Sequence, residues 1–183
     1  GEKIKYRPFL VKEQKTLMLA SESEDDAQIR DALAGVISGC TFEKIDPFTI
    51  PMFDIEFLFL KIRGKSVGEK IELNLLCPDD GETRVKTTIN LEDVGVNQKL
   101  GHTNEISMTD NIKIIMKYPT IAEMVGININ NSDIDQVLDM MKRCVHEIHD
   151  GETVHSKIDM SESDLDEFIG SLTNEQFENL ASF

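Results

Sequence analysis

Residues 52–63 of the chain read MFDIEFLFLKIR, a stretch that is apolar around almost its entire circumference when drawn as a helix. A helix that is apolar on all sides is buried inside its protein. Gly64 follows directly, and glycine commonly caps the C-terminus of a helix. The segment therefore predicts a buried central helix that ends near Gly64, with Phe53, Phe57 and Leu60 in the hydrophobic core.

The residues after this helix change from helical to strand periodicity. Apolar and polar residues alternate along Lys70–Leu76 and again along Arg84–Leu91. The sequence PDDG at residues 78–81, between the two runs, is typical of a tight turn. Alternation on both sides of such a turn predicts a β-hairpin.

A second pair of strands is predicted over Glu105–Met108 and Ile112–Tyr118. We expect the two pairs together to form a β-rich insert over residues 69–118. Helical patterns flank this insert, in residues 1–68 and in residues 119–183. The predicted fold class is therefore α+β, a mainly helical compact domain that carries a small antiparallel β insert.

Shorter elements complete the N-terminal segment. Lys3–Phe9 predicts a short strand, and Leu10–Glu22 predicts a helix. Ser23 and Asp26 form the expected N-cap pair of a further helix that continues to Cys40. The N-terminal segment is thus expected to contain one strand followed by helices.

The C-terminal segment is predicted to be mostly helical. Thr120–Val125 predicts a short helix, and Ser132 is expected to cap a longer one whose apolar face runs over Ile134–Ile148. A short extended piece is expected at Thr153–Ile158. Two more helices are predicted, one that starts at Ser161 or Ser163 and one that is opened by the capping box Thr173–Gln176.

The formal net charge of the 183 residues is −15. A field of this sign repels phosphate groups, so neither nucleic acid nor an anionic membrane is expected as a partner. The charge fits either solubility alone or docking to a basic protein surface. Three widely spaced cysteines, Cys40, Cys77 and Cys144, favour a reducing compartment over a disulfide framework.

Cys144, His146, His149 and His155 lie close together in the sequence and include the candidate metal ligands. On a helix, His146 and His149 can share one metal ion, which suggests a metal-dependent hydrolase as an alternative function. Cys144 points elsewhere on such a helix, and neither HExxH nor a paired CxxC is present in the sequence. The dipole at a helix C-terminus also favours histidines. We therefore expect no metal ion and no other cofactor.

Acidic residues gather in three places, namely Asp79/Asp80, Glu92/Asp93 and Asp164/Asp166/Glu167. A turn accounts for the first pair, and the start of a helix, where the dipole favours anions, accounts for the last group. The sequence contains neither a nucleotide-binding loop nor a nucleophile elbow. These patterns predict a protein that is not an enzyme.

Three stretches of the chain carry a family resemblance. They are KYRPFLVKEQK at residues 5–15, FDIEFLFLKIR with the following KSVGE at residues 53–63 and 65–69, and Cys77-Pro78 with the hairpin after it. They resemble the baseplate protein family of T-even-type contractile-tailed phages, which is common in marine cyanophages. The resemblance implies a baseplate hub subunit or a baseplate hub assembly factor. It further implies residence in the host cytoplasm during assembly or in the virion baseplate, and additional sequence before Gly1 and after Phe183.

The leading hypothesis is a non-enzymatic structural or assembly protein that contacts other baseplate and tail proteins. Asp164, Asp166 and Glu167 are the predicted partner-binding residues, because they can face a basic protein while their helix packs its apolar side inward. The β-hairpin is the second predicted recognition surface. One alternative is a metal-dependent hydrolase that uses His146, His149 and His155. The other is a generic soluble adaptor or chaperone. The sequence leaves the oligomeric state open.

Overall fold

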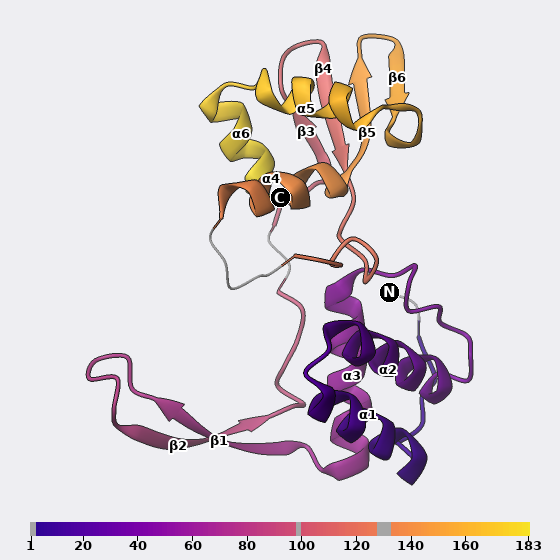
Figure 1. Ribbon diagram of the computed structural model, residues 1–183, viewed down its shortest axis with the longest axis vertical. Helices are drawn as coiled ribbons and strands as arrows, with labels where there is room; N and C mark the ends of the chain where they lie inside the picture. The colour runs from indigo at the N-terminus through magenta and orange to yellow at the C-terminus, as the bar shows by residue number, and fades with distance from the viewer. Residues whose placement is uncertain (1–2, 98–99, 128–132) are drawn as a thin grey trace. The chain divides into compact units, whose positions relative to one another are not determined.

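The computed structural model describes residues 3–97, 100–127 and 133–183. The chain divides into two compact units, Gly1–Asn97 and Gln98–Phe183. The described residues contain six α-helices and two antiparallel sheets, labelled in Figure 1, which confirms the predicted α+β class. The division at Asn97 does not coincide with the segment boundaries expected after residues 68 and 118.

Three helices form the body of the N-terminal unit: α1 (Val11–Ser23), α2 (Asp26–Cys40) and α3 (Met52–Val67). The helices predicted in these regions are confirmed, but Ser23 and Asp26 are not the N-cap pair of α2. Asp25 is the N-cap, and its carboxylate accepts the N–H groups of Ala27 (2.8 Å) and Gln28 (3.3 Å). The Ser23 hydroxyl donates instead to the carbonyl of Ala20.

The buried face of α3 differs from the predicted one. Ile55, Leu58 and Ile62 point into the core, whereas Phe53 is 37% exposed and Phe57 and Leu60 are half-buried. The other two helices of the unit cover only one side of α3. Although α3 is apolar all round, it therefore buries a single stripe of residues with the spacing i, i+3, i+7. Ile62 packs there with Val36 and Cys40 of α2.

Helix α3 also continues past Gly64, where its end was predicted. Its C-cap is Gly68, whose positive φ of 107° suits glycine. Gly64 is buried inside the helix, and a Cβ built there meets the Leu91 side chain at 3.8 Å. Gly64 therefore marks the place where the chain packs back onto α3 after the hairpin.

Lys3–Phe9 is extended but forms no strand, contrary to the prediction. The Arg7 N–H donates to the carbonyl of Cys40 (2.9 Å), but no neighbouring strand among the described residues extends this contact into a ladder. An ion pair holds the segment instead: the Arg7 guanidinium donates to both carboxylate oxygens of Glu13 (2.8 and 3.2 Å). This hydrogen bond lowers the pKa of Glu13 to about 2.

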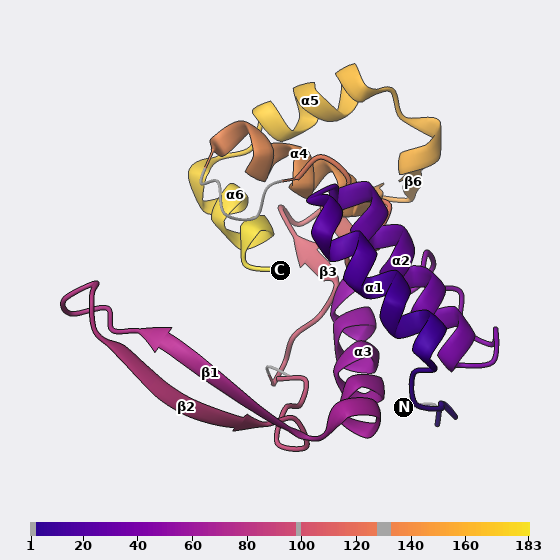
Figure 2. The same cartoon turned by 60° about the horizontal axis from the view of Figure 1, so that its bottom comes forward.

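The predicted hairpin is confirmed as β1 (Lys70–Leu76) and β2 (Arg84–Asn90), which pair antiparallel over seven residues each. In Figures 1 and 2 it extends away from α1–α3. Lys61 of α3 fixes its base, because the ammonium group donates to the carbonyls of Leu91 (3.1 Å) and Val94 (3.2 Å). Leu91 itself is only 3% exposed.

The C-terminal unit is built on a four-stranded antiparallel sheet in the order β3-β4-β5-β6. The strands are β3 (Glu105–Ser107), β4 (Ile112–Met116), β5 (Val145–Asp150) and β6 (Thr153–Ser156). The second predicted strand pair is confirmed as β3 and β4, and it joins β5 and β6 instead of the hairpin.

The long helix predicted to continue to Ile148 ends earlier. Helix α4 covers Ile134–Cys144, and the chain then changes into β5. Val145 and Ile148 continue the helical spacing in sequence, but they pair with Met116 and Ile114 of β4, and this pairing overrides the local pattern. The N-cap of α4 is Asp133, whereas the predicted cap, Ser132, lies outside the described residues.

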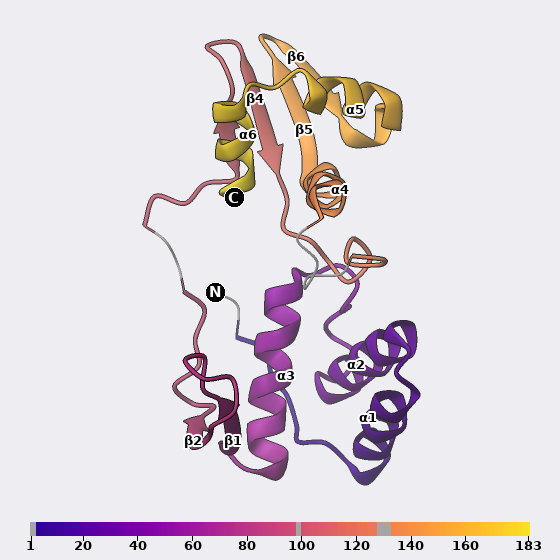
Figure 3. The same cartoon turned by 60° about the vertical axis from the view of Figure 1, so that its left-hand side comes forward.

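Helices α5 (Glu162–Gly170) and α6 (Asn174–Ala181) follow a short 3-10 turn, η1 (Lys157–Asp159). The capping box predicted at Thr173 is confirmed, and of the two predicted starts of α5 the N-cap is Ser161, which also forms a capping box with Asp164. Thr120–Val125 contains turns and not the predicted helix. Leu165 and Ile169 of α5 share a core with Ile114 of the sheet, so one sheet face is covered (Figure 3). No helix among the described residues is long and apolar enough to cross a membrane.

Candidate protein-binding surfaces

One face of the β1–β2 hairpin carries a continuous apolar row. The cross-strand pairs are Ile71 with Ile89, Leu73 with Thr87, and Leu75 with Val85. Their side chains share one face because alternate residues of paired strands point the same way. Leu75 is 51% exposed, Val85 54% and Ile89 40%. A two-stranded hairpin is only marginally stable by itself in water, so this row is an incomplete hydrophobic surface.

The opposite face of the hairpin is basic. Lys70, Arg84 and Lys86 project from it together with one acid, Glu72. The chain as a whole carries a net charge of −15, so this face is a local exception. Apolar and basic faces together give the hairpin the two kinds of contact that a protein interface uses.

Asp80 at the hairpin tip has a structural role. The Asp80 carboxylate accepts the hydroxyl of Thr83 and the backbone N–H groups of Glu82 (3.0 Å) and Thr83 (2.9 Å). These bonds lower the pKa of Asp80 to about 2. The carboxylate therefore closes the turn that was predicted at residues 78–81. Cys77, next to the turn, is a free thiol.

The three candidate metal-ligating histidines do not converge. His146 and His149 lie on β5 and His155 on β6, contrary to the helix that was assumed for the first two. His149 pairs with Val154, which places His155 on the other sheet face, beside its partner Ile148. Within the described ranges no group of three His, Cys, Asp or Glu side chains is arranged to hold a metal ion. The geometry therefore gives no support to the hydrolase alternative.

Glu147 occupies the exposed sheet face together with His149. One of its carboxylate oxygens lies 2.8 Å from Nε2 of His149, and the other lies 3.7 Å from Nε2 of His146. Lys113 and Glu105 form a further ion pair at 2.6 Å on strands β4 and β3. This polar arrangement resembles an ordinary solvated sheet face.

The predicted partner-binding acids of α5 fall into three different environments. Asp164 belongs to the N-terminal capping box with Ser161. Asp166 forms an ion pair with Lys142 of α4 (2.6 Å), which raises the pKa of that lysine. Glu167 is exposed, and no ion pair to it is found among the described residues. Glu167 is therefore the acid of this group whose charge is most available to a partner.

Asp164 also lines a pocket of about 420 Å³ at the edge of the C-terminal sheet. His155 also lines this pocket, although the two residues were predicted in separate sites. The remaining lining residues are Ile112, Ile148, Asp150, Asp159, Met160 and Phe168. An apolar floor with an acidic rim suits a long basic side chain better than a catalytic reaction.

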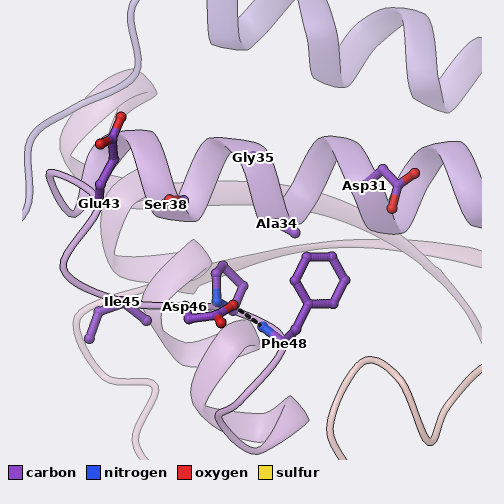
Figure 4. Close-up of a pocket in the computed structure, with 9 residues that line it drawn as sticks. Asp31, Ala34, Gly35, Ser38, Glu43, Ile45, Asp46 and Phe48 are labelled. Carbon is purple, nitrogen blue, oxygen red and sulfur yellow. Dashed lines mark hydrogen bonds between the residues drawn. The ribbon is translucent and has the colours of Figure 1, made fainter.

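The N-terminal unit has a pocket of about 430 Å³ that sequence reasoning missed (Figure 4). Small residues of α2, among them Ala34 and Gly35, form one wall, and the loop after α2 forms the other. The Phe48 side chain points toward α2, and the backbone N–H of Phe48 donates to the Asp46 carboxylate (3.0 Å). Asp31, Ser38, Glu43 and Asp46 also line the pocket, but among the described residues no hydrogen bond joins the Ser38 hydroxyl to a carboxylate, so the pocket shows no activated nucleophile.

A second missed feature is an apolar groove of about 550 Å³ formed by all three helices of this unit. Leu17 of α1, Leu33 of α2 and Phe59 of α3 are among its lining residues. The groove exists because α3 is apolar on more sides than α1 and α2 cover. That excess apolar character in residues 52–63 is the sequence signal that indicates it.

The chain was compared with known proteins. Searches of curated proteins and of solved structures each gave no significant match. A family model described as T4 bacteriophage base plate protein matches residues 1–183, the whole of the chain, in agreement with the resemblance noted from its sequence motifs. The chain therefore belongs to the T4 bacteriophage base plate protein family.

Proposed function

We propose that the chain is a non-enzymatic structural subunit of the phage baseplate hub that acts through contacts with other baseplate and tail proteins. Membership of the baseplate family supports the structural role. The scattered histidines and the structural use of the Asp80 carboxylate supply no competing catalytic arrangement. Assembly takes place in the host cell, and the subunit stays in the virion baseplate.

One observation carries the proposal, namely the half-exposed apolar row on the β1–β2 hairpin. Burial of the exposed half of a Leu or Val side chain is worth about 1 kcal/mol. Several such side chains stand in a row on an element that is firmly attached to α3. The hairpin therefore gains stability when another protein covers it.

The same row favours a resident subunit over a transient assembly factor. Obligate interfaces are more apolar than transient ones and resemble a protein core cut in half. Leu75 and Val85 are more than half exposed, as expected for a surface that is permanently covered in the assembled particle. A transient factor is expected to present a more polar surface.

Helix α5 supplies a second contact surface in this proposal. Asp164, Asp166 and Glu167 make it acidic, and its partner is a basic protein surface. Charges at the rim of an interface act mainly on the rate of association. The hairpin supplies most of the affinity, and α5 guides the approach.

The test uses a tagged chain expressed during phage infection. Proteins that co-purify with it from infected cells are identified by mass spectrometry, and purified particles are searched for the chain. We expect baseplate and tail proteins in the first experiment and the chain itself in the second. The double variant Leu75→Ser/Val85→Ser is expected to abolish both results, whereas Val154→Ser, which changes an equally exposed residue of β6, leaves them intact.

Two outcomes contradict the proposal in different ways. A chain that co-purifies with tail proteins but never enters particles is a transient assembly factor. A chain that co-purifies with no tail protein at all is not a baseplate component of either kind.

A further inference from the structure

We infer that the outer edge of β2 accepts an extended strand of a partner protein in which apolar and acidic residues alternate. This inference rests on the proposed function and names the partner chemistry of the same hairpin. β1 pairs with one side of β2, and no described strand pairs with the other. An edge strand with free backbone groups is a template for strand addition.

The ladder shows which backbone groups are free. Leu91 N donates to the carbonyl of Glu69 (2.7 Å), and Cys77 N donates to the carbonyl of Thr83 (2.8 Å). Hydrogen-bonded pairs alternate with non-bonded pairs along an antiparallel ladder. The N–H and C=O groups of Arg84, Lys86 and Thr88 therefore point away from β1, toward the open edge.

The side chains of these same residues define the charge that a partner strand meets. Arg84 and Lys86 lie on the polar face of β2, with Thr88 between them and the base of the hairpin. The corresponding positions of β1 are mixed, because Lys70 is followed by Glu72. A strand added beside β2 places every second side chain next to Arg84 and Lys86, where carboxylates are favoured and ammonium groups are not.

The intervening side chains of the added strand lie on the apolar face. They extend the row formed by Val85, Thr87 and Ile89 and cover part of its exposed surface. An alternating apolar and acidic strand thus satisfies the backbone, the charge and the hydrophobic face together. No other simple pattern satisfies all three.

A second copy of this chain fits less well. Two β2 edges placed side by side bring Arg84 and Lys86 of both copies together, and like charges across a strand pair are destabilising.

Contacts at the base of the hairpin hold this edge in place. Lys65 of α3 bridges Glu69 (2.8 Å) and Glu92 (4.0 Å), which lie just outside the two strands. Together with the Lys61 contacts this fixes the strand pair before a partner arrives. A pre-ordered edge lowers the entropy lost on binding.

The experiment measures binding of two labelled seven-residue peptides to the purified chain by fluorescence anisotropy. One peptide alternates Glu and Val, and the other alternates Lys and Val. We expect the Glu peptide to bind roughly tenfold or more tightly than the Lys peptide. Hydrogen exchange is expected to show new protection at the amides of Arg84, Lys86 and Thr88.

The double variant Arg84→Glu/Lys86→Glu is expected to reverse this preference, so that the Lys peptide binds better. Lys70→Glu on β1 is the matched control and should leave the preference unchanged. Circular dichroism confirms that each variant keeps the fold of the parent chain. Equal binding of both peptides, no binding of either, or protection on β1 instead of β2 overturns the inference.

These results remain separate from the proposed function. A chain that is found in particles but fails the peptide test is a baseplate subunit that uses its hairpin in another way. A chain that passes the peptide test but is absent from particles retains the strand-binding edge and loses the proposed role.

Discussion

The β1–β2 sheet of the N-terminal unit and the β3–β6 sheet of the C-terminal unit both alternate apolar and polar residues, but their apolar faces have different surroundings. In the C-terminal sheet, Ile114 and Ile148 are 0% and 5% exposed, because α5 packs against them. In the hairpin, Leu75 and Val85 remain about half exposed. The same sequence pattern thus gives a buried apolar face in the C-terminal unit and a half-exposed apolar face in the N-terminal unit.

The difference separates two kinds of apolar row. An apolar row that the chain covers itself contributes to its stability. A row that it leaves uncovered contributes to the stability of a complex. The two kinds of residue are expected to respond differently to the same substitution.

The largest expected effect on stability is in the buried core of the C-terminal unit. Ile114→Ala should lower the free energy of unfolding of the C-terminal unit by roughly 2–5 kcal/mol, from lost burial and the cavity left behind. Leu75→Ala should lower that of the N-terminal unit by less than about 1 kcal/mol when the chain is alone. Denaturant unfolding followed by amide exchange in each unit measures both values. Equal losses in the two variants would remove the distinction between the sheets.

The second comparison lies within α3, where the structure corrected the predicted buried face. Ile62→Ala removes a fully buried side chain and should cost about 3 kcal/mol. Phe57 is half-buried and lies under the ammonium group of Lys61, 4.9 Å from the ring centroid. Phe57→Ala should therefore cost less, about 1–2 kcal/mol. A larger loss for Phe57 in the same unfolding assay would restore the face expected from sequence.

The third prediction concerns pH and the clamp between Arg7 and Glu13. The folded-state pKa of Glu13 is about 2 against an ordinary value of 4.5, so its contribution to stability is complete above pH 4.5 and is lost as the pH falls toward 2. Glu13→Gln should destabilise the N-terminal unit by about 1–2 kcal/mol at neutral pH. It should also flatten the dependence of stability on pH in that window. An unchanged slope would show that the clamp is energetically unimportant.

The smallest effect is expected at α5. Glu167→Gln should slow association with a basic partner about twofold, because one unpaired surface charge is lost. Raising salt from 0.1 M to 1 M should slow the parent chain more than the variant, since the screening length falls from about 10 Å to about 3 Å. Asp166→Asn, which also frees Lys142, is the comparison variant. Surface plasmon resonance with the captured partner measures the rates, and identical salt dependence would leave α5 as a solubilising surface.

Some parts of the fold that depend on neighbouring residues were predictable, although the caps expected at Ser23/Asp26 and Gly64 were wrong. Alternation around residues 78–81 defined the hairpin, and the capping box at Thr173 defined the start of α6. The parts that depend on distant residues were not. Val145 and Ile148 fit a helix in sequence, and only pairing with β4 makes them a strand.

The candidate binding surfaces also divide into features that depend on local sequence and features that depend on distant residues. The hairpin was predicted as a recognition surface because its pattern is local, whereas its lack of a covering layer is visible only in the fold. Strands β4, β5 and β6, the turn η1 and helix α5 all contribute residues to the pocket lined by His155 and Asp164, so no local motif could indicate it. The buried face of α3 was undetermined because the segment is apolar on every side.

Cross-linking mass spectrometry of purified phage particles tests the central claim most directly, because the hairpin carries two reactive lysines, Lys70 and Lys86. If the hairpin is the docking element of a resident baseplate subunit, both lysines should form cross-links to another baseplate or tail protein. Lys113, on the solvated face of the C-terminal sheet, serves as the internal comparison. Hairpin lysines that link only to their own chain in intact particles would contradict the account.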